Sequence, residues 1–199
     1  MRVETIGLGH RFDAVVLRDV ELVVETGRSL ALFGRNGSGK STLLRCLAGL
    51  LRPTVGQVLV DGDPVLELRP ATRARIGYVA HRPLVWGGLT AAENLELCGA
   101  LYRIAVDPAA ALERVGLDRS ARVLARALSQ GQRQRLAIAR ALLPAPTLLL
   151  LDEPHAALDE EGAEMLDTLV HEHAGAVTMV LSTHERERGQ ALCDAELVL

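Results

Sequence analysis

The chain has 199 residues, which fits one compact domain and is long enough to bury a proper core. Hydrophobic residues make up 49% and charged residues 24%, a composition that excludes a disordered protein and suits a globular α/β domain. The formal net charge of -3 gives no support to non-specific binding of nucleic acid.

Cysteine usage and hydropathy indicate a cytoplasmic protein. Cys46, Cys98 and Cys193 form no C-x-x-C pair and are an odd number, so we expect free thiols in a reducing compartment. The N-terminus lacks a signal-peptide pattern, and no apolar run approaches the roughly 18 residues of a membrane span. If the protein serves a membrane, we expect it to do so through a partner.

Strand-like and helix-like patterns alternate along most of the chain. Apolar runs predict strands over Val20–Val24, Leu30–Phe33, Val58–Val60, Ile76–Val79, Leu148–Leu151 and Val177–Leu181. Helical patterns cover Lys40–Leu50, Ala91–Leu101, Gln132–Leu143 and Gly162–His173. This alternation predicts an α/β fold with a mostly parallel sheet that is covered on both faces.

The alternation stops from about Pro83 to Leu128, where the pattern is helical and no convincing strand occurs. We interpret this region as part of a helical subdomain, about 83–142, that is inserted into a single domain spanning 1–199. No internal repeat, low-complexity tract or linker divides the chain further.

Residues Gly34–Ser41 read G-R-N-G-S-G-K-S and match the phosphate-loop pattern G-x-x-x-x-G-K-[ST] between a predicted strand and a predicted helix. Glycines allow tight turns that bring backbone N–H groups against phosphate oxygens. Lys40 is the only lysine, since all other Lys or Arg positions hold arginine. A compact ammonium can bridge the β- and γ-phosphates, whereas a planar guanidinium is wider.

We therefore expect ATP and Mg²⁺ at this loop, with Ser41 as a Mg²⁺ ligand. The expected nucleotide-binding residues are Gly34, Arg35, Asn36, Gly37, Ser38, Gly39, Lys40, Ser41 and Thr42.

Leu128–Gln132 reads L-S-Q-G-Q and precedes the helical pattern R-Q-R-L-A-I-A-R-A-L. Ser129 and Gln132 have the spacing of an S-x-x-Q capping box, and the N-terminus of such a helix is an anion site. Gly131 leaves room for a phosphate. This segment therefore predicts a second phosphate-binding element.

Two acids follow the apolar run L-L-L-L, at the end of a strand where open parallel sheets bind their ligands. Asp152 is placed to hold Mg²⁺, directly or through water. Glu153 can polarise the water that attacks the γ-phosphate.

With the phosphate loop, L-S-Q-G-Q and the acid pair in this order, nearly the whole chain resembles the ATP-binding cassette (ABC) ATPases. Gln130 stands where the family usually has glycine. The resemblance implies a P-loop ATPase core with a mostly parallel sheet, a small antiparallel β part near the N-terminus and an inserted helical subdomain.

The resemblance also implies partners. In this family two chains pack head to tail, so that Ser129, Gly131 and Gln132 of one chain close over the γ-phosphate on the phosphate loop of the other. We expect a second ABC ATPase chain, giving a homodimer, together with integral membrane subunits and no nucleic acid. The protein is then expected at the inner face of the cell membrane.

Further residues match the family in order. Asp159, at the end of A-A-L-D, lies where the family couples its two sites, and His184 in S-T-H-E resembles the switch histidine that contacts the γ-phosphate. Phe12 matches the aromatic residue that stacks on adenine, although a phenylalanine in an early strand is also typical of a core. We interpret His155, His171 and His173 as solvated residues rather than metal ligands.

His81 stands where the family usually has a glutamine that reaches Mg²⁺ and the attacking water. A neutral imidazole can accept a hydrogen bond from a metal-bound water, so His81 is a catalytic and metal-binding candidate. The stretch Ala80–Tyr102, with the capping box Thr90–Glu93, resembles the ATPase subunits of cytochrome c biogenesis haem exporters, where histidine occupies that place. Haem export is the expected transport, and a compact exporter of drug or lipid type is the alternative.

Two other classes of ABC protein have less support from the sequence. A nucleic-acid-associated cassette would show a long coiled-coil insertion or a second cassette, and neither is present. A non-hydrolysing scaffold would be expected to lack Glu153 or His184, and both are present. The cargo is not expected to be encoded in this chain, because membrane subunits shape the translocation path.

Overall fold

The structure is a computed structural model that describes residues 1–199. Its strands are β1 (Val3–Arg11), β2 (Val15–Val24), β3 (Ser29–Phe33), β4 (Val55–Val60), β5 (Asp63–Pro64), β6 (Ile76–Val79), β7 (Leu148–Asp152), β8 (Thr178–Ser182) and β9 (Ala195–Val198). Its α-helices are α1 (Lys40–Leu47), α2 (Pro70–Arg73), α3 (Ala91–Tyr102), α4 (Pro108–Glu113), α5 (Gln130–Leu142), α6 (Glu160–His173) and α7 (Arg186–Leu192).

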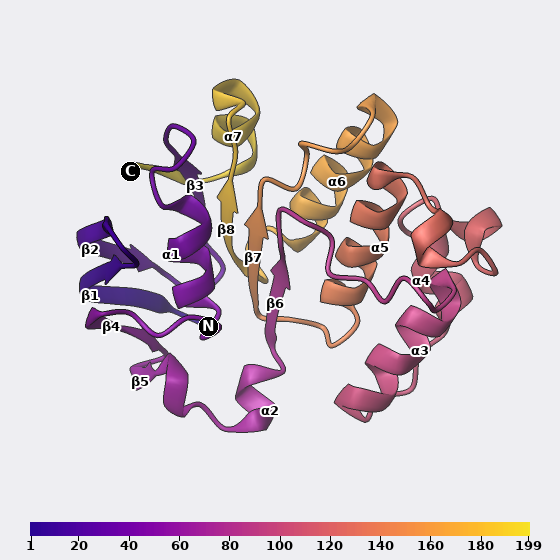
Figure 1. Cartoon of the computed structure of the whole chain (residues 1–199), viewed down its shortest axis with the longest axis horizontal. Helices are drawn as coiled ribbons and strands as arrows, with labels where there is room; N and C mark the ends of the chain where they lie inside the picture. Colours follow the sequence, from indigo (N-terminus) through magenta and orange to yellow (C-terminus); the bar gives the residue numbers. More distant parts are fainter.

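A five-stranded parallel sheet runs through the centre of the molecule in the order β6-β7-β8-β3-β9 (Figure 1). All four of its strand pairs are parallel. This sheet confirms the α/β fold expected from the alternating pattern. Because the strands are parallel, their carboxyl ends lie at one edge, where a ligand site is expected.

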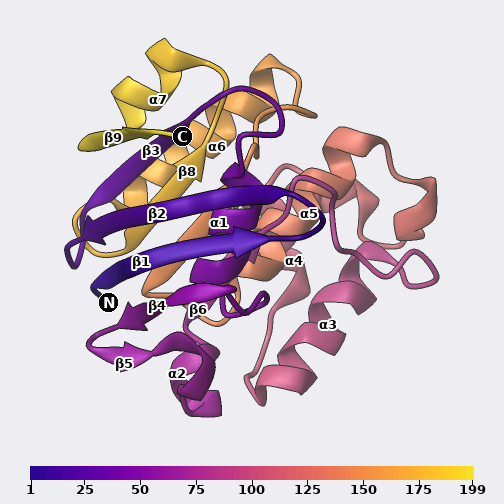
Figure 2. The same ribbon diagram turned by 60° about the vertical axis from the view of Figure 1, so that its left-hand side comes forward.

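A second, antiparallel sheet has the order β2-β1-β4-β5. Helix α1 lies between this sheet and the parallel one, as the two views in Figures 1 and 2 show. The small antiparallel part expected near the N-terminus is therefore present.

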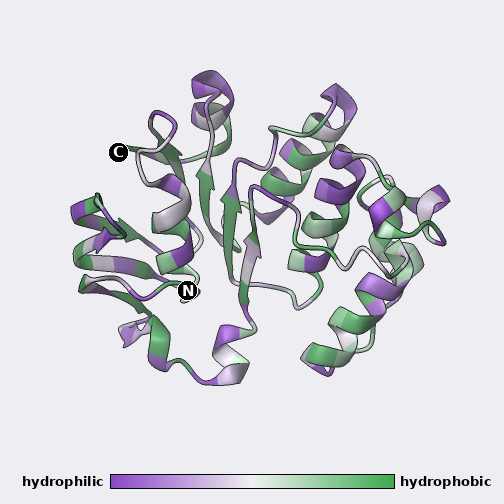
Figure 3. Ribbon diagram, viewed as in Figure 1, coloured by the Kyte–Doolittle hydropathy of each residue, from purple (hydrophilic) through white to green (hydrophobic).

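Alternate residues of the central strands enter two separate hydrophobic cores. Leu148 and Leu150 of β7 pack in the core that contains α1 and the antiparallel sheet. Leu149 and Leu151 pack in the other core, with α5 and α6. Figure 3 accordingly shows β7 and β8 as hydrophobic, whereas the helices carry hydrophobic and hydrophilic bands. Replacing the fully buried Leu150 by alanine is expected to cost about 2–5 kcal/mol.

Helices α3, α4 and α5 lie beyond β6, on the side away from the antiparallel sheet (Figure 1). Thr90 caps α3: its Oγ1 accepts from the Glu93 N–H at 3.2 Å, and Glu93 Oε2 accepts from the Thr90 N–H at 2.7 Å. The buried Asn94 side chain binds both backbone groups of Trp86. The chain that leads from β6 is therefore fixed to α3. None of the helices has the length and apolarity required to cross a bilayer.

Helix boundaries differ from the sequence prediction at the end of α1 and at the starts of α5 and α6, where α6 begins at Glu160 because Asp159 is its N-cap. Helix α1 ends at Leu47, earlier than predicted, because the N–H of Gly49 bonds to Cys46 O and that of Leu50 to Arg45 O. These two bonds form a Schellman motif, with Gly49 at φ 67°. Helix α5 begins at Gln130 because Ser129 is its N-cap.

Candidate active site

The carboxyl ends of β3, β6, β7 and β8 surround a pocket of about 590 Å³. Its lining residues come from distant parts of the chain and are Phe12, Val16, Asn36, Gly37, Gly39, Lys40, Ser41, Thr42, His81, Glu153 and His184. The pocket therefore brings together most of the residues that the sequence singled out. Gly34, Arg35, Ser38 and Asp152 lie beside it and do not line it.

The phosphate loop has left-handed backbone angles at Gly37 (φ 81°) and Gly39 (φ 105°). A Cβ atom at Gly39 would lie 2.6 Å from Leu17 Cδ2 and 3.0 Å from the Val16 carbonyl oxygen. Only glycine fits there without displacing β2, whereas a Cβ at Gly37 would meet no atom. Gly39 thus holds the loop against β2, and Gly37 leaves the pocket side open.

Lys40 is held inside the loop that precedes it. Its side chain is only 5% exposed, and Nζ donates to Gly34 O at 2.8 Å and to Arg35 O at 3.3 Å. These carbonyl contacts leave the ammonium pointing into the pocket that it lines. A planar guanidinium has a different donor geometry and would not make these two contacts in the same way.

Three basic side chains converge on the carboxylate of Glu153. His184 Nε2 lies 2.7 Å and Lys40 Nζ 3.5 Å from Oε1. His81 Nδ1 lies 3.6 Å from Oε2. Glu153 itself has a left-handed φ of 48°, which turns its side chain out of the strand direction at the end of β7. An incoming phosphate would meet the same basic groups as this carboxylate.

Asp152 is fully buried next to Glu153. Ser182 Oγ donates to Asp152 Oδ1 at 2.9 Å and accepts from the Glu153 N–H at 2.9 Å. The other carboxylate oxygen, Asp152 Oδ2, has no hydrogen-bond partner. A buried carboxylate oxygen without a partner is suited to binding a cation or its water, so the site fits Mg²⁺. Ser182 was not among the residues predicted from sequence, although Ser182 begins the S-T-H-E stretch.

Phe12 follows β1 and is 57% exposed. Its ring makes an edge contact with the His10 ring, with centroids 4.5 Å apart. The alternative that Phe12 belongs to the core is wrong, because the turn between β1 and β2 holds it at the surface beside the pocket. Stacking on adenine stays a prediction.

A second pocket, of about 600 Å³, lies at the N-terminus of α5. It is lined by Gly116, Ser129, Gly131, Gln132, Arg135, Ala157, Asp159 and Glu161. The predicted capping box is present, because Ser129 Oγ accepts from the Gln132 N–H at 3.1 Å and Gln132 Oε1 from the Ser129 N–H at 2.9 Å. The two pockets share no residue. Ser129 therefore does not contribute to the pocket that contains Lys40 in the same chain.

The sequence profile described as ABC transporter matches residues 17–156. The chain belongs to the ABC transporter family. The match includes the phosphate loop, the capped α5 helix and the acid pair at the end of β7.

Curated relatives of this ABC protein include CcmA export proteins and SsuB import proteins. The cytochrome c biogenesis ATP-binding export protein CcmA of Nitrosococcus oceani is 43% identical over 183 residues, covering 92% of this chain and 85% of the relative. CcmA of Pseudomonas putida is 39% identical over 188 residues, covering 92% and 90%. The aliphatic sulfonates import ATP-binding protein SsuB 3 of Pseudomonas savastanoi pv. phaseolicola is 40% identical over 188 residues, covering 92% and 67%.

Solved ABC structures have the same fold. A dimer of the ATP-binding cassette MJ0796, in a post-hydrolysis state bound to ADP and Pi, superposes with a TM-score of 0.90 at 29% identity, covering 99% of this chain and 94% of that one. An ATP-binding subunit of an ABC transporter gives 0.89 at 30% identity, covering 100% and 86%. The chain is thus an ABC ATPase, and the expected P-loop α/β fold is confirmed.

In this ABC ATPase the segment around Asp159 is fixed to α5. Arg135 Nη2 donates to Asp159 Oδ1 at 2.5 Å, and the Gly162 N–H donates to the same oxygen at 3.1 Å. These two bonds lower the pKa of Asp159. A Cβ at Gly131 would lie 2.8 Å from Ala157 O, so glycine there permits close packing of α5 on this segment. Arg135, which follows L-S-Q-G-Q on the same helix, was not among the residues predicted from sequence.

The prediction that His155 is a solvated residue is wrong. The residue is 6% exposed, and its Nε2 lies 2.8 Å from Asp167 Oδ1. His171 is exposed and His173 half-buried, each with Nδ1 at 2.7 Å from a backbone oxygen of α6. His155 alone of these three is enclosed by the fold, with its ring held against Asp167 of α6.

Proposed function

We propose that this ABC ATPase powers haem export for cytochrome c biogenesis through integral membrane subunits. The main support is the length of the match to CcmA. This chain covers 85% and 90% of the two CcmA proteins but only 67% of SsuB 3, at similar identity. His81 adds support, since it stands at the end of β6 where the haem-exporter resemblance expects histidine, and its ring faces Glu153.

For ATP, we assign the phosphates to the phosphate loop, from Gly34 to Thr42, with Lys40 between the β- and γ-phosphates. Phe12 is assigned to the adenine ring. Ser41 and Asp152 are the residues that would hold Mg²⁺, with His81 in contact through water. When bound, Mg²⁺ would neutralise negative charge that develops on the phosphates. The unpartnered Asp152 Oδ2 and the pocket-lining Ser41 support this assignment.

For hydrolysis, Glu153 accepts a hydrogen bond from the attacking water and takes up its proton as the oxygen bonds to the γ-phosphorus. The bond from the γ-phosphorus to the bridging oxygen breaks, which yields ADP and inorganic phosphate. His184 and Lys40, which contact Glu153 in this structure, are assigned to the γ-phosphate. Glu153 would then be released from these contacts toward the water.

The separation of the two pockets supports a head-to-tail homodimer. Ser129, Gly131 and Gln132 line a pocket that contains no residue of the phosphate loop. In the proposed dimer they close over the γ-phosphate held by the second chain, and Asp159 lies at the contact between the chains. Each of the two sites then needs both chains.

We propose that residues 1–199 form one nucleotide-binding domain and that its helical subdomain, about 83–142, receives the membrane subunits. An apolar groove of about 350 Å³ runs between the segment that follows α1, strand β6, and helices α3 and α5. Leu50, Leu84 and Tyr102 line it and are 64%, 61% and 40% exposed. Clustered apolar side chains of this kind mark a protein contact. The groove includes Ala80, directly before His81, so a membrane subunit in it would touch the segment that reaches Glu153.

A deletion strain of the native host tests the transport function. We expect loss of haem-containing c-type cytochromes, measured by haem staining, and rescue by the wild-type gene but not by Glu153→Gln. Growth on aliphatic sulfonates as the sulfur source should be unchanged.

Sulfonate import is the second candidate, because SsuB proteins match this chain at 40% identity. Normal c-type cytochromes together with lost growth on sulfonates would establish import and contradict haem export. If both properties stay normal, neither haem export nor sulfonate import depends on this chain.

A further inference from the structure

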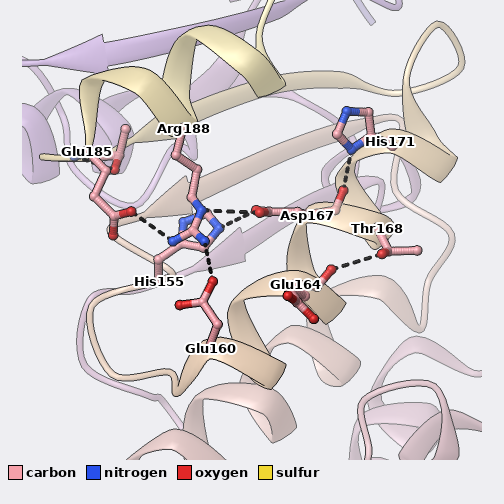
Figure 4. A network of polar contacts seen from close by, with 9 residues as sticks. His155, Glu160, Glu164, Asp167, Thr168, His171, Glu185 and Arg188 are labelled. Carbon is pink, nitrogen blue, oxygen red and sulfur yellow. Dashed lines mark hydrogen bonds and ion pairs between the residues drawn. The ribbon is translucent and has the colours of Figure 1, made fainter.

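A buried histidine lies behind the pocket, on the loop that links Glu153 to α6. The His155 side chain is 3% exposed, and its Nε2 lies 2.8 Å from Asp167 Oδ1 in the middle of α6 (Figure 4). No residue of the ATP pocket touches this ring in the hydrogen-bond network, so direct contact with nucleotide does not explain it.

Asp167 also contacts α7 through its second carboxylate oxygen. Arg188 Nε lies 3.2 Å from Asp167 Oδ2. The same guanidinium donates to Glu185 Oε2 at 2.8 Å and lies 3.4 Å from Glu160 Oε1 (Figure 4). One carboxylate on α6 therefore joins the loop after β7 to the start of α7.

The two loops joined in this way are those that carry the catalytic candidates. His155 is two residues after Glu153, and Glu185 directly follows His184. In the pocket the same loops meet through the 2.7 Å contact between His184 and Glu153. The loops are thus connected twice, once in the pocket and once behind it through His155, Asp167 and Arg188.

The His155 ring is suited to a directional hydrogen bond. Its Nδ1 is buried and has no partner, so a proton on that atom would find no acceptor. Burial lowers the pKa of His155, while the carboxylates of Asp167 and Glu185 oppose this shift and Arg188 adds to it. The neutral ring with its proton on Nε2 donates to Asp167 and leaves Nδ1 unprotonated.

We propose that His155 is a positioning residue for ATP hydrolysis: through Asp167 and Arg188 it fixes the Glu153 loop relative to His184. This inference rests on the roles proposed above for Glu153 and His184. Misplacing a reacting group by about 1 Å can reduce turnover by roughly 10²-fold. Loss of the His155 bond is therefore expected to reduce kcat without weakening ATP binding.

Two substitutions separate the hydrogen bond from packing. His155→Phe keeps a ring but removes the donor, and we expect kcat to fall by at least about tenfold, with ATP affinity within about twofold. His155→Gln retains an N–H donor at similar reach and should stay within about threefold of wild type. Glu172→Gln is the matched control, because Glu172 is another α6 carboxylate paired with arginine, Arg114 at 3.0 Å, and touches neither loop.

A double-mutant cycle with Glu153→Gln tests whether His155 acts through Glu153. We expect His155→Phe to cause no further loss of the residual hydrolysis in that background. An equal loss in both backgrounds, or full kcat in folded His155→Phe, would overturn the proposal. Wild-type turnover in Glu153→Gln alone would instead contradict the role of Glu153, which keeps the two failures distinct.

Thermal unfolding and ATP affinity of each variant are measured first. If His155→Phe does not fold, Asp167→Asn provides the same test, because it keeps the shape of the side chain and removes its charge. If Asp167→Asn reduces kcat but causes no further loss in the Glu153→Gln background, the proposal is supported. An unchanged kcat in Asp167→Asn contradicts it.

Discussion

His184 Nε2 and Glu153 Oε1 lie 2.7 Å apart, so the loops that follow β8 and β7 meet inside the pocket. The same oxygen of Glu153 is 3.5 Å from Lys40 Nζ. Both basic groups are assigned to phosphate in the ATP complex. A bound phosphate would therefore compete with the carboxylate of Glu153 for its two nearest contacts.

Glu153→Gln is expected to reduce ATP hydrolysis by at least about 10²-fold, because the proposed general base is lost. ATP binding should be unchanged or tighter, since one negative charge near the phosphates is removed. Steady-state hydrolysis and calorimetric titration measure the two effects. Glu164→Gln, at an exposed position of α6, is the control. Hydrolysis at the wild-type rate would contradict the assignment.

Lys40→Ala should weaken ATP binding by at least about tenfold, since a charge-assisted hydrogen bond is worth about 1.5–3 kcal/mol. Lys40→Arg should not restore binding, because a planar guanidinium does not reproduce the compact ammonium contacts to Gly34 O and Arg35 O. Calorimetry measures both affinities, with the exposed Arg52→Ala as the control for lost charge. Wild-type affinity in Lys40→Ala would disprove the role of the ammonium.

Because of His155, we expect the free energy of unfolding to depend on pH. Because burial lowers its pKa, the unfolded chain binds a proton there in a pH range where the folded protein does not. The free energy of unfolding should fall as the pH drops below about 6.5, the ordinary pKa of histidine. Urea unfolding at several pH values measures this slope. The slope should be smaller in His155→Gln, and equal slopes would show that other groups cause it.

Leu84→Asp should prevent co-purification with the membrane subunits, because it places a charge in the apolar groove. ATP binding by the isolated chain should be unchanged, since Leu84 does not line the ATP pocket. Val23→Asp is the control, because it places the same charge at an apolar residue of β2 that is 52% exposed and lies outside the groove. If Leu84→Asp still co-purifies like Val23→Asp, the groove is not the contact surface.

Local sequence patterns were sufficient to locate the phosphate loop and the acid pair of the candidate site. The phosphate loop and the acid pair are each contiguous in sequence, so their local geometry depends on residues that are neighbours in the chain. The end of α1 was predicted less accurately, because a Schellman motif at Gly49 decides it. The cap at Ser129 was predicted, although the helical pattern was placed from Gln132 and α5 begins at Gln130.

Contacts between distant segments could not be predicted in this way. Ser182 binds Asp152, and Arg135 binds Asp159, only because neighbouring strands and helices bring them together. His155 was assigned to solvent for the same reason: its burial depends on α6 and α7, which follow it in the chain. Such pairs carry no periodic or motif signal.

The central claim is that each ATP site combines two chains, and mixing two inactive variants tests it most directly. Ser129→Arg blocks the pocket at the start of α5, and Lys40→Ala disables the phosphate loop. In a mixed dimer one site carries both changes, whereas the other has an intact phosphate loop facing an intact Ser129. With half of the dimers mixed and one site active in each, hydrolysis should recover to about a quarter of the wild-type rate. Activity that equals only the sum of the two separate variants would contradict the composite site.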